Sequence, residues 1–177
     1  MAITAEDRRR YKHVQGQIEA IVREIAAARG FAKASREPHT GKAVAISWEQ
    51  PAPWKRDRLR LLFIWGTGYR QVHTDVSLAV RRANGTFVSV DGAPARWIAR
   101  RSPEDLRIHE GCQDLPSALA STLRTDLIHA FAWLGDRYQT PALTLQAMSS
   151  GERNGVRIGS GPHREACATL TKLPAST

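Results

Sequence analysis

The sequence predicts an α+β fold in which an antiparallel four- or five-stranded meander packs against an N-terminal helix and a long C-terminal helix. Three observations support this prediction. The first 30 residues contain an apolar stripe at helical spacing, residues 42–90 alternate polar and apolar side chains, and a second helical stripe begins near residue 117. The links between the alternating segments are too short for parallel crossovers, so we expect antiparallel pairing.

The N-terminal helix has a start signal and a stop signal. Thr4 and Asp7 have the spacing of a capping box, in which the two side chains satisfy backbone N–H groups reciprocally. Gly30 followed by Phe31 is typical of a helix that ends in a Schellman motif. Such an apolar stripe is expected to be buried against the sheet. The residues of the stripe recur three or four positions apart and are Tyr11, Val14, Ile18, Ile21, Val22 and Ile25.

Four segments have the pattern of strands. Residues 42–48 alternate, residues 59–65 are apolar nearly throughout as in a central strand, and residues 71–81 alternate most regularly. A Pro-rich loop with a charged stretch is expected over 50–58. Asn84-Gly85 favours a hairpin turn, because both positions tolerate a positive φ, and predicts a fourth strand over 86–90. Residues 96–100 are the candidate for a short fifth strand.

The C-terminal half begins with a helix near Ser117. Its stripe consists of Leu119, Leu123, Leu127, Phe131, Leu134 and Tyr138. Thr140-Pro141 then predicts a shorter helix that runs to Met148, because proline is favoured at the first helical position. The sequence therefore predicts a single α+β domain over 1–148 and a Gly/Ser/Arg-rich tail over 149–177. We expect this tail to be loosely docked or disordered, with a small hairpin at Asn154-Gly155.

The composition favours a basic cytoplasmic protein. The net charge is +9, and 21 of the 26 basic residues are arginines. Two explanations remain open: codon usage in a GC-rich genome, or selection for an anionic ligand, which the planar guanidinium binds well. The sequence has no apolar run of about 20 residues and no signal-peptide pattern. Its charge predicts an acidic protein partner, and nucleic acid is the other anionic partner to consider.

No motif predicts catalysis or a cofactor. The pairs His109/Cys112 and His163/Cys167 have spacings that a zinc site would allow, but the favoured explanation is two ordinary thiols and two surface imidazoles, because such spacings often arise by chance. His73 and Asp75 share a strand face with Ser77, yet residues two apart on a strand project in parallel and do not form a catalytic triad. The sequence thus favours a binding protein over an enzyme.

Five residues are the predicted binding groups: Trp54, Tyr69, His73, Arg81 and Arg82. Aromatic residues in a Pro-rich loop and a glycine turn, next to arginines, have the composition of interface hot spots. For Trp54 the alternative is that the ring folds back onto the edge of the sheet. Nucleic-acid binding would instead use the basic clusters, which are Arg8–Arg10, Lys55–Arg60, Arg81-Arg82, and Arg96 with Arg100-Arg101.

The stretch Ile25-Ala-Ala-Ala-Arg-Gly30-Phe31, which closes the first helix before the meander, resembles the opening of an uncharacterised bacterial domain-of-unknown-function family. The resemblance covers about residues 10–90 and implies an α+β fold without established catalysis. Some proteins of this kind lie near toxin genes. The resemblance therefore implies a protein-binding role, and more specifically that of an immunity protein that neutralises a toxin.

Overall fold

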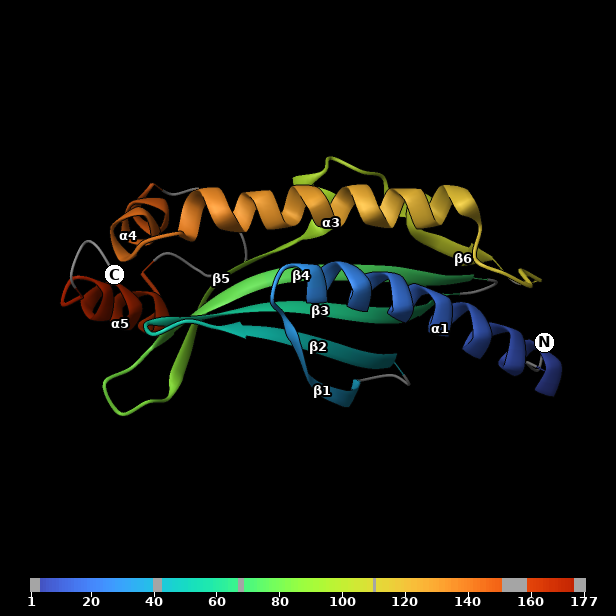
Figure 1. Cartoon of the computed structure of the whole chain (residues 1–177), viewed down its shortest axis with the longest axis horizontal. Coiled ribbons are helices and arrows are strands. Elements are labelled where there is room, and N and C mark those ends of the chain that lie inside the picture. The colour runs from blue at the N-terminus through green and yellow to red at the C-terminus, as the bar shows by residue number, and fades with distance from the viewer. Residues whose placement is uncertain (1–3, 40–42, 67–68, 110, 151–158, 174–177) are drawn as a thin grey trace.

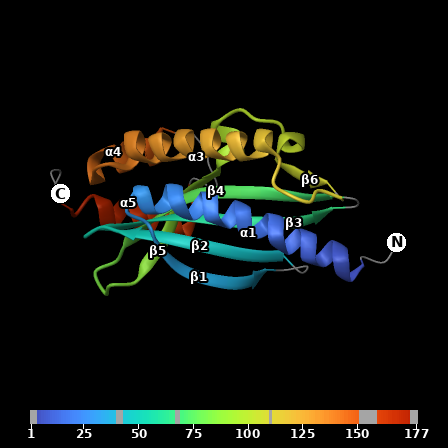
Figure 2. The same ribbon diagram turned by 45° about the vertical axis from the view of Figure 1, so that its right-hand side comes forward.

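The fold is α+β, as the sequence predicts: a curved antiparallel sheet has two long helices, α1 (Ala5–Ala28) and α3 (Ser117–Tyr138), on one of its faces (Figures 1 and 2). The computed structural model describes residues 4–39, 43–66, 69–109, 111–150 and 159–173. Among these residues, no helix combines the length and the apolar character needed to cross a bilayer.

The sheet is a meander with one short added strand. Consecutive strands pair antiparallel in the order β1-β2-β3-β4-β5, and β6 (Arg107–His109) pairs with β4 near Tyr69. The predicted antiparallel order is therefore confirmed. The bounds of the first five strands are β1 (Ala32–His39), β2 (Ala43–Pro51), β3 (Lys55–Gly66), β4 (Tyr69–Arg81) and β5 (Phe87–Pro94).

The structure adds strands that the sequence does not predict. Strand β1 is an edge strand with the polar sequence AKASREPH, so it lacks the apolar alternation that marks the other strands. The loop predicted over 50–58 is much shorter, because β2 continues to Pro51 and β3 already begins at Lys55. The charged residues at these positions are accommodated by ion pairs, since Lys55 pairs with Asp57 and both Arg56 and Arg58 pair with Glu49.

The candidate fifth strand over 96–100 is wrong. This segment contains the short helix α2 (Ala95–Ile98), for which Pro94 is the N-cap residue. After α2 the chain forms a single 3₁₀ turn, η2 (Pro103–Leu106), and then returns to β4 as β6. Strand β4 is thus paired on one side with β5 near Arg81 and with β6 near Tyr69.

Both ends of α1 have the predicted caps. The Thr4 hydroxyl accepts a hydrogen bond from the Asp7 backbone N–H (3.1 Å), and the Asp7 carboxylate accepts one from the Thr4 backbone N–H (3.1 Å). At the other end Gly30 has a φ of 80°, and the Phe31 N–H donates to the Ala26 carbonyl (3.0 Å). The second Schellman bond runs from the Gly30 N–H to the Ala27 carbonyl, also at 3.0 Å.

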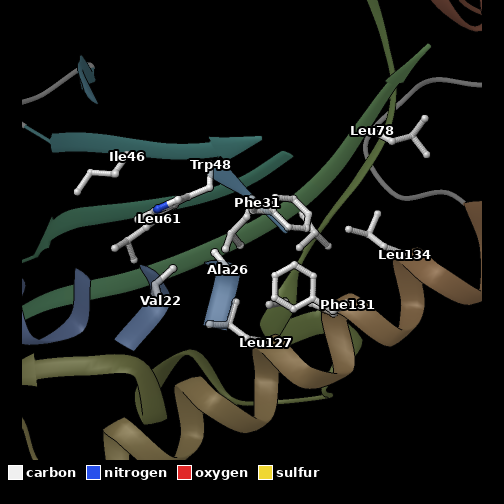
Figure 3. Close-up of a cluster of buried hydrophobic side chains, with 14 of the residues drawn as sticks. Val22, Ala26, Phe31, Ile46, Trp48, Leu61, Leu78, Leu127, Phe131 and Leu134 are labelled. Carbon is white, nitrogen blue, oxygen red and sulfur yellow. The ribbon is translucent and has the colours of Figure 1, made fainter. Parts of the chain in front are cut away.

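A single main core fills the space between the helices and the sheet. The inner face of α1 contributes Val14, Ile18 and Val22, which are fully buried. Trp48 from β2 and Leu61 from β3 meet them from the sheet (Figure 3). The stripe predicted on α3 is buried as well, with Leu119, Leu123, Leu127, Phe131, Leu134 and Tyr138 all in this core.

Two further helices complete the covered side. Helix α4 (Pro141–Ser149) begins as predicted, with the Thr140 hydroxyl accepting from the Leu143 N–H at 3.2 Å. Where the sequence predicts a loosely docked or disordered tail, the structure has α5 (Gly161–Leu170), whose Ala166 and Leu170 are buried in the main core. The hairpin expected at Asn154-Gly155 lies outside the described residues.

Candidate binding surface

The face of the sheet opposite α1 and α3 carries a lattice of cross-strand ion pairs. Glu49 lies directly across from Arg58, and Arg60 lies directly across from Asp75. Strand alternation explains this placement: odd positions of β3 face the core, so its even positions carry arginine on the other face. We call this surface the arginine face and define it by Glu49, Arg56, Arg58, Arg60, His73 and Asp75.

The ion pairs hold the arginines in fixed positions. Glu49 accepts hydrogen bonds from Nε and Nη2 of Arg58, at 2.9 and 2.7 Å, and its other oxygen lies 3.2 Å from Nη1 of Arg56. Asp75 accepts a hydrogen bond from Nη2 of Arg60 at 2.6 Å. The carboxylates are the more sheltered partners, since Glu49 is 17% and Asp75 22% exposed, whereas Arg58 is 43% and Arg60 40% exposed. The arginine face therefore presents positive charge to solvent.

His73 lies within this charged surface. Burial lowers the pKa of its imidazole, and the neighbouring guanidinium groups of Arg96 and Arg60 lower it further, although Asp75 acts in the opposite direction. His73 is therefore neutral at physiological pH. Asp75 accepts a hydrogen bond from Arg60. Because the side chains of His73 and Asp75 point in the same direction from β4, they do not have the geometry of a catalytic acid–base pair.

The lowered pKa of His73 predicts a loss of stability in mild acid. Between the folded pKa and the ordinary histidine value of about 6.5, the unfolded chain binds more protons than the folded chain, so stability falls as the pH falls through this window. When the pH is lowered from neutral to about 5.5, we expect the urea midpoint of His73→Gln to fall less than that of the wild type. Measured urea curves at both pH values test this. An unchanged pH dependence in the variant would rule out His73 as the source.

The five predicted binding residues do not form one site. Tyr69 and Arg81 lie at opposite ends of β4, about 40 Å apart at about 3.3 Å per residue. The Tyr69 ring is covered by the Arg107 guanidinium at 4.3 Å from the ring centroid. Arg82 forms a bidentate ion pair with Glu165 of α5, with Nη2 3.0 Å from Oε2, and so binds within the chain. Of the five, His73 alone belongs to the arginine face.

Trp54 is buried, so the prediction that it is an exposed binding group is wrong, and the alternative, that its ring folds back, is confirmed. Only 5% of the residue is exposed, because a tight turn between β2 and β3 folds the ring back into the main core. This turn is closed by the Ala52 N–H, which donates to the Lys55 carbonyl at 2.8 Å. Among the tryptophans whose exposure the structure describes, Trp97 on α2 is the exposed one, at 57%, and its ring centroid lies 5.4 Å from the Arg96 guanidinium. Helix α2 packs against α3, β4 and β5, and its Arg96 is one of the charged groups that lower the pKa of His73.

The two His/Cys pairs lie at opposite ends of the molecule and do not assemble a shared site. His109 is in β6, near the start of α1, whereas His163 and Cys167 are on α5 (Figure 1). The thiol of Cys167 is 4.0 Å from Nδ1 of His163. Within the described ranges, no group of three or more His, Cys, Asp or Glu side chains has an arrangement suited to a metal ion.

Comparisons of this chain with models of protein families, with curated proteins and with solved structures found no match. The surface chemistry of the chain itself is therefore the guide to its function.

Proposed function

We propose that this protein is a non-catalytic binding protein that recognises an acidic surface of another protein through the arginine face. The proposal rests mainly on one observation. In the Arg58–Glu49 and Arg60–Asp75 ion pairs, the guanidinium group is more exposed to solvent than the carboxylate that binds it. A rigid array of this kind binds with little loss of side-chain entropy, because its arginines are already ordered by Glu49 and Asp75.

Trp97 supplies the apolar contact that such an interface requires. Interface hot spots are enriched in tryptophan and arginine, and the exposed Trp97 together with Arg96 offers both. The proposed location is the cytoplasm, which the free thiols of Cys112 and Cys167 support, because thiols stay reduced there. The resemblance described above supports a particular case, in which the partner is a toxin and this chain is its immunity protein.

The proposal predicts that neutralising the arginine face weakens partner binding. A partner captured after nuclease treatment is produced separately, and its affinity is measured for the wild type and for the double variant Arg58→Gln/Arg60→Gln. We expect at least a tenfold loss, equivalent to about 1.4 kcal/mol. Trp97→Ala is expected to increase the dissociation rate, as the loss of an apolar anchor does. If the partner is a toxin, co-expression with the wild type, but not with the double variant, restores growth.

The matched control is Arg9→Gln/Arg23→Gln, which removes the same charge from exposed positions on α1. Equal losses in both double variants would contradict a specific role of the arginine face. A partner signal that disappears on nuclease treatment would favour the alternative, a nucleic-acid-binding accessory protein. In that case filter binding should weaken steeply with salt, because phosphate contacts release counterions.

A further inference from the structure

A cavity of about 200 Å³, open to solvent on one side, lies on the helix-covered side of the sheet. It is formed where the end of α1 meets β2, β3 and the second half of α3. Phe31, Phe131 and Leu134 are buried side chains that form its apolar walls, and Arg29 is exposed at its mouth. Figure 3 shows Phe31, Phe131 and Leu134 facing one another between α3 and the sheet. Its polar lining residues are Arg29, Gln50 and Asp57.

Asp57 is the unusual member of this lining. It is only 9% exposed, and its Oδ2 accepts a hydrogen bond from the Lys55 ammonium at 2.8 Å. Its Oδ1 is buried and accepts no hydrogen bond from the described residues. Burial raises the pKa of this carboxyl despite the neighbouring Lys55. Asp57 is nevertheless one of the residues that line the cavity, so its carboxyl is available as the acceptor for a ligand that donates a hydrogen bond there.

Arg29 provides the complementary group. Its guanidinium lies 5.6 Å from the centroid of the Phe131 ring, and in the described part of the chain no carboxylate pairs with it. Because Lys55 already balances the charge of Asp57, the charge left over at the cavity is the positive charge of Arg29. This arrangement favours an anionic group at Arg29 and a neutral donor, not a second cation, at Asp57.

We propose that this cavity binds a small single-ring aromatic molecule whose anionic group pairs with Arg29 and whose hydroxyl group donates to Asp57. The size fits one ring, since an engineered apolar cavity of about 150 Å³ in another protein holds benzene. The Phe31 and Phe131 rings, whose centroids are 5.2 Å apart with planes tilted by 52°, offer the edges and faces against which an aromatic ring packs well. The site lies on the opposite side of the sheet from the arginine face.

The test uses 4-hydroxybenzoate, benzoate and phenol as probes, with saturation-transfer NMR and titration on the full chain. We expect saturable binding of 4-hydroxybenzoate, and severalfold weaker binding of benzoate and of phenol, each of which lacks one of the two groups. Asp57→Ala should remove the preference for 4-hydroxybenzoate over benzoate, a ratio that does not depend on a modest loss of stability. Leu134→Trp, which fills the cavity, should abolish binding of all three probes.

Arg29→Gln keeps the proposal falsifiable if a buried substitution prevents folding, because Arg29 is exposed. It should weaken 4-hydroxybenzoate about tenfold, as expected for the loss of a charged hydrogen bond. The matched control Arg23→Gln, on the same helix, should leave binding unchanged. Failure of every probe to saturate in the millimolar range, or binding that Arg29→Gln leaves intact, would overturn the inference. Either result leaves the arginine face untouched, because the two surfaces share no residue.

Discussion

Trp48→Ala is expected to lower the free energy of unfolding by about 3–5 kcal/mol, the usual cost of deleting a large buried aromatic side chain. Trp48 is 1% exposed and lies between β2 and α1, close to Val22 and Ala26 (Figure 3). The substitution removes one of the largest fully buried side chains from the core between the helices and the sheet. Since small domains are stable by only about 5–15 kcal/mol, a large part of the total would be lost.

Urea unfolding measures this effect when it is monitored by far-UV circular dichroism, because that signal comes mainly from the backbone and not from tryptophan. The matched control is Trp97→Ala, which removes the same side chain from a position that is 57% exposed and should change stability by no more than about 0.5 kcal/mol. Trp48→Phe should cost less than Trp48→Ala, because it keeps most of the apolar surface. It also removes an indole N–H for which the described residues provide no acceptor. Equal effects at Trp48 and Trp97 would contradict the core described above.

Gly92→Ala is expected to destabilise the protein by about 1–3 kcal/mol, the typical cost of inserting atoms into a filled space. Gly92 in β5 lies directly opposite Ser77 in β4. A Cβ added at Gly92 would be 2.8 Å from the Ser77 Cβ and 3.2 Å from the Val76 carbonyl oxygen. Relief requires β5 to move away from β4, because backbone atoms are among those in conflict.

The matched control for this substitution is Gly16→Ala on α1. Gly16 is exposed in the middle of a helix, and a Cβ there would meet nothing within 4 Å. Alanine should therefore raise the free energy of unfolding by about 0.5–1 kcal/mol. The two Gly→Ala variants are thus expected to shift the urea midpoint in opposite directions. A neutral or stabilising Gly92→Ala would show that the β4–β5 pairing is less closely packed.

Local signals in the sequence are strong enough to predict the helices and the central strands. The caps at Thr4 and Gly30 bound α1 because they depend on neighbouring residues alone. Strand β1 escapes prediction because an edge strand with a polar sequence has no apolar face to reveal it. Its position is determined by pairing with β2, which is a tertiary interaction.

The candidate sites are harder to predict from the sequence. They depend on which residues of β3 point to the core and which point to the opposite face of the sheet. Asp57 lies within the basic run 55–60, whose composition suggests a solvated segment. Extending the alternation of Leu59 and Leu61 backwards by one step would place Asp57 on the buried side and Arg58 and Arg60 on the other. The burial of Trp54 is hard to predict for another reason. The Pro-rich composition of its loop indicates an exposed side chain, whereas the tight turn between β2 and β3 buries the ring.

The order of the elements along the chain has a consequence for biosynthesis. The strands are made before α3 and α5, the helices that cover much of the apolar side of the sheet. Until those helices leave the ribosome, the nascent meander has only α1 to shield it, and residues such as Leu78 and Val80 stay open to other chains. This domain can therefore complete its fold only after α5 has left the ribosome, and we expect the emerging chain to be a client of the chaperones that hold exposed apolar strands.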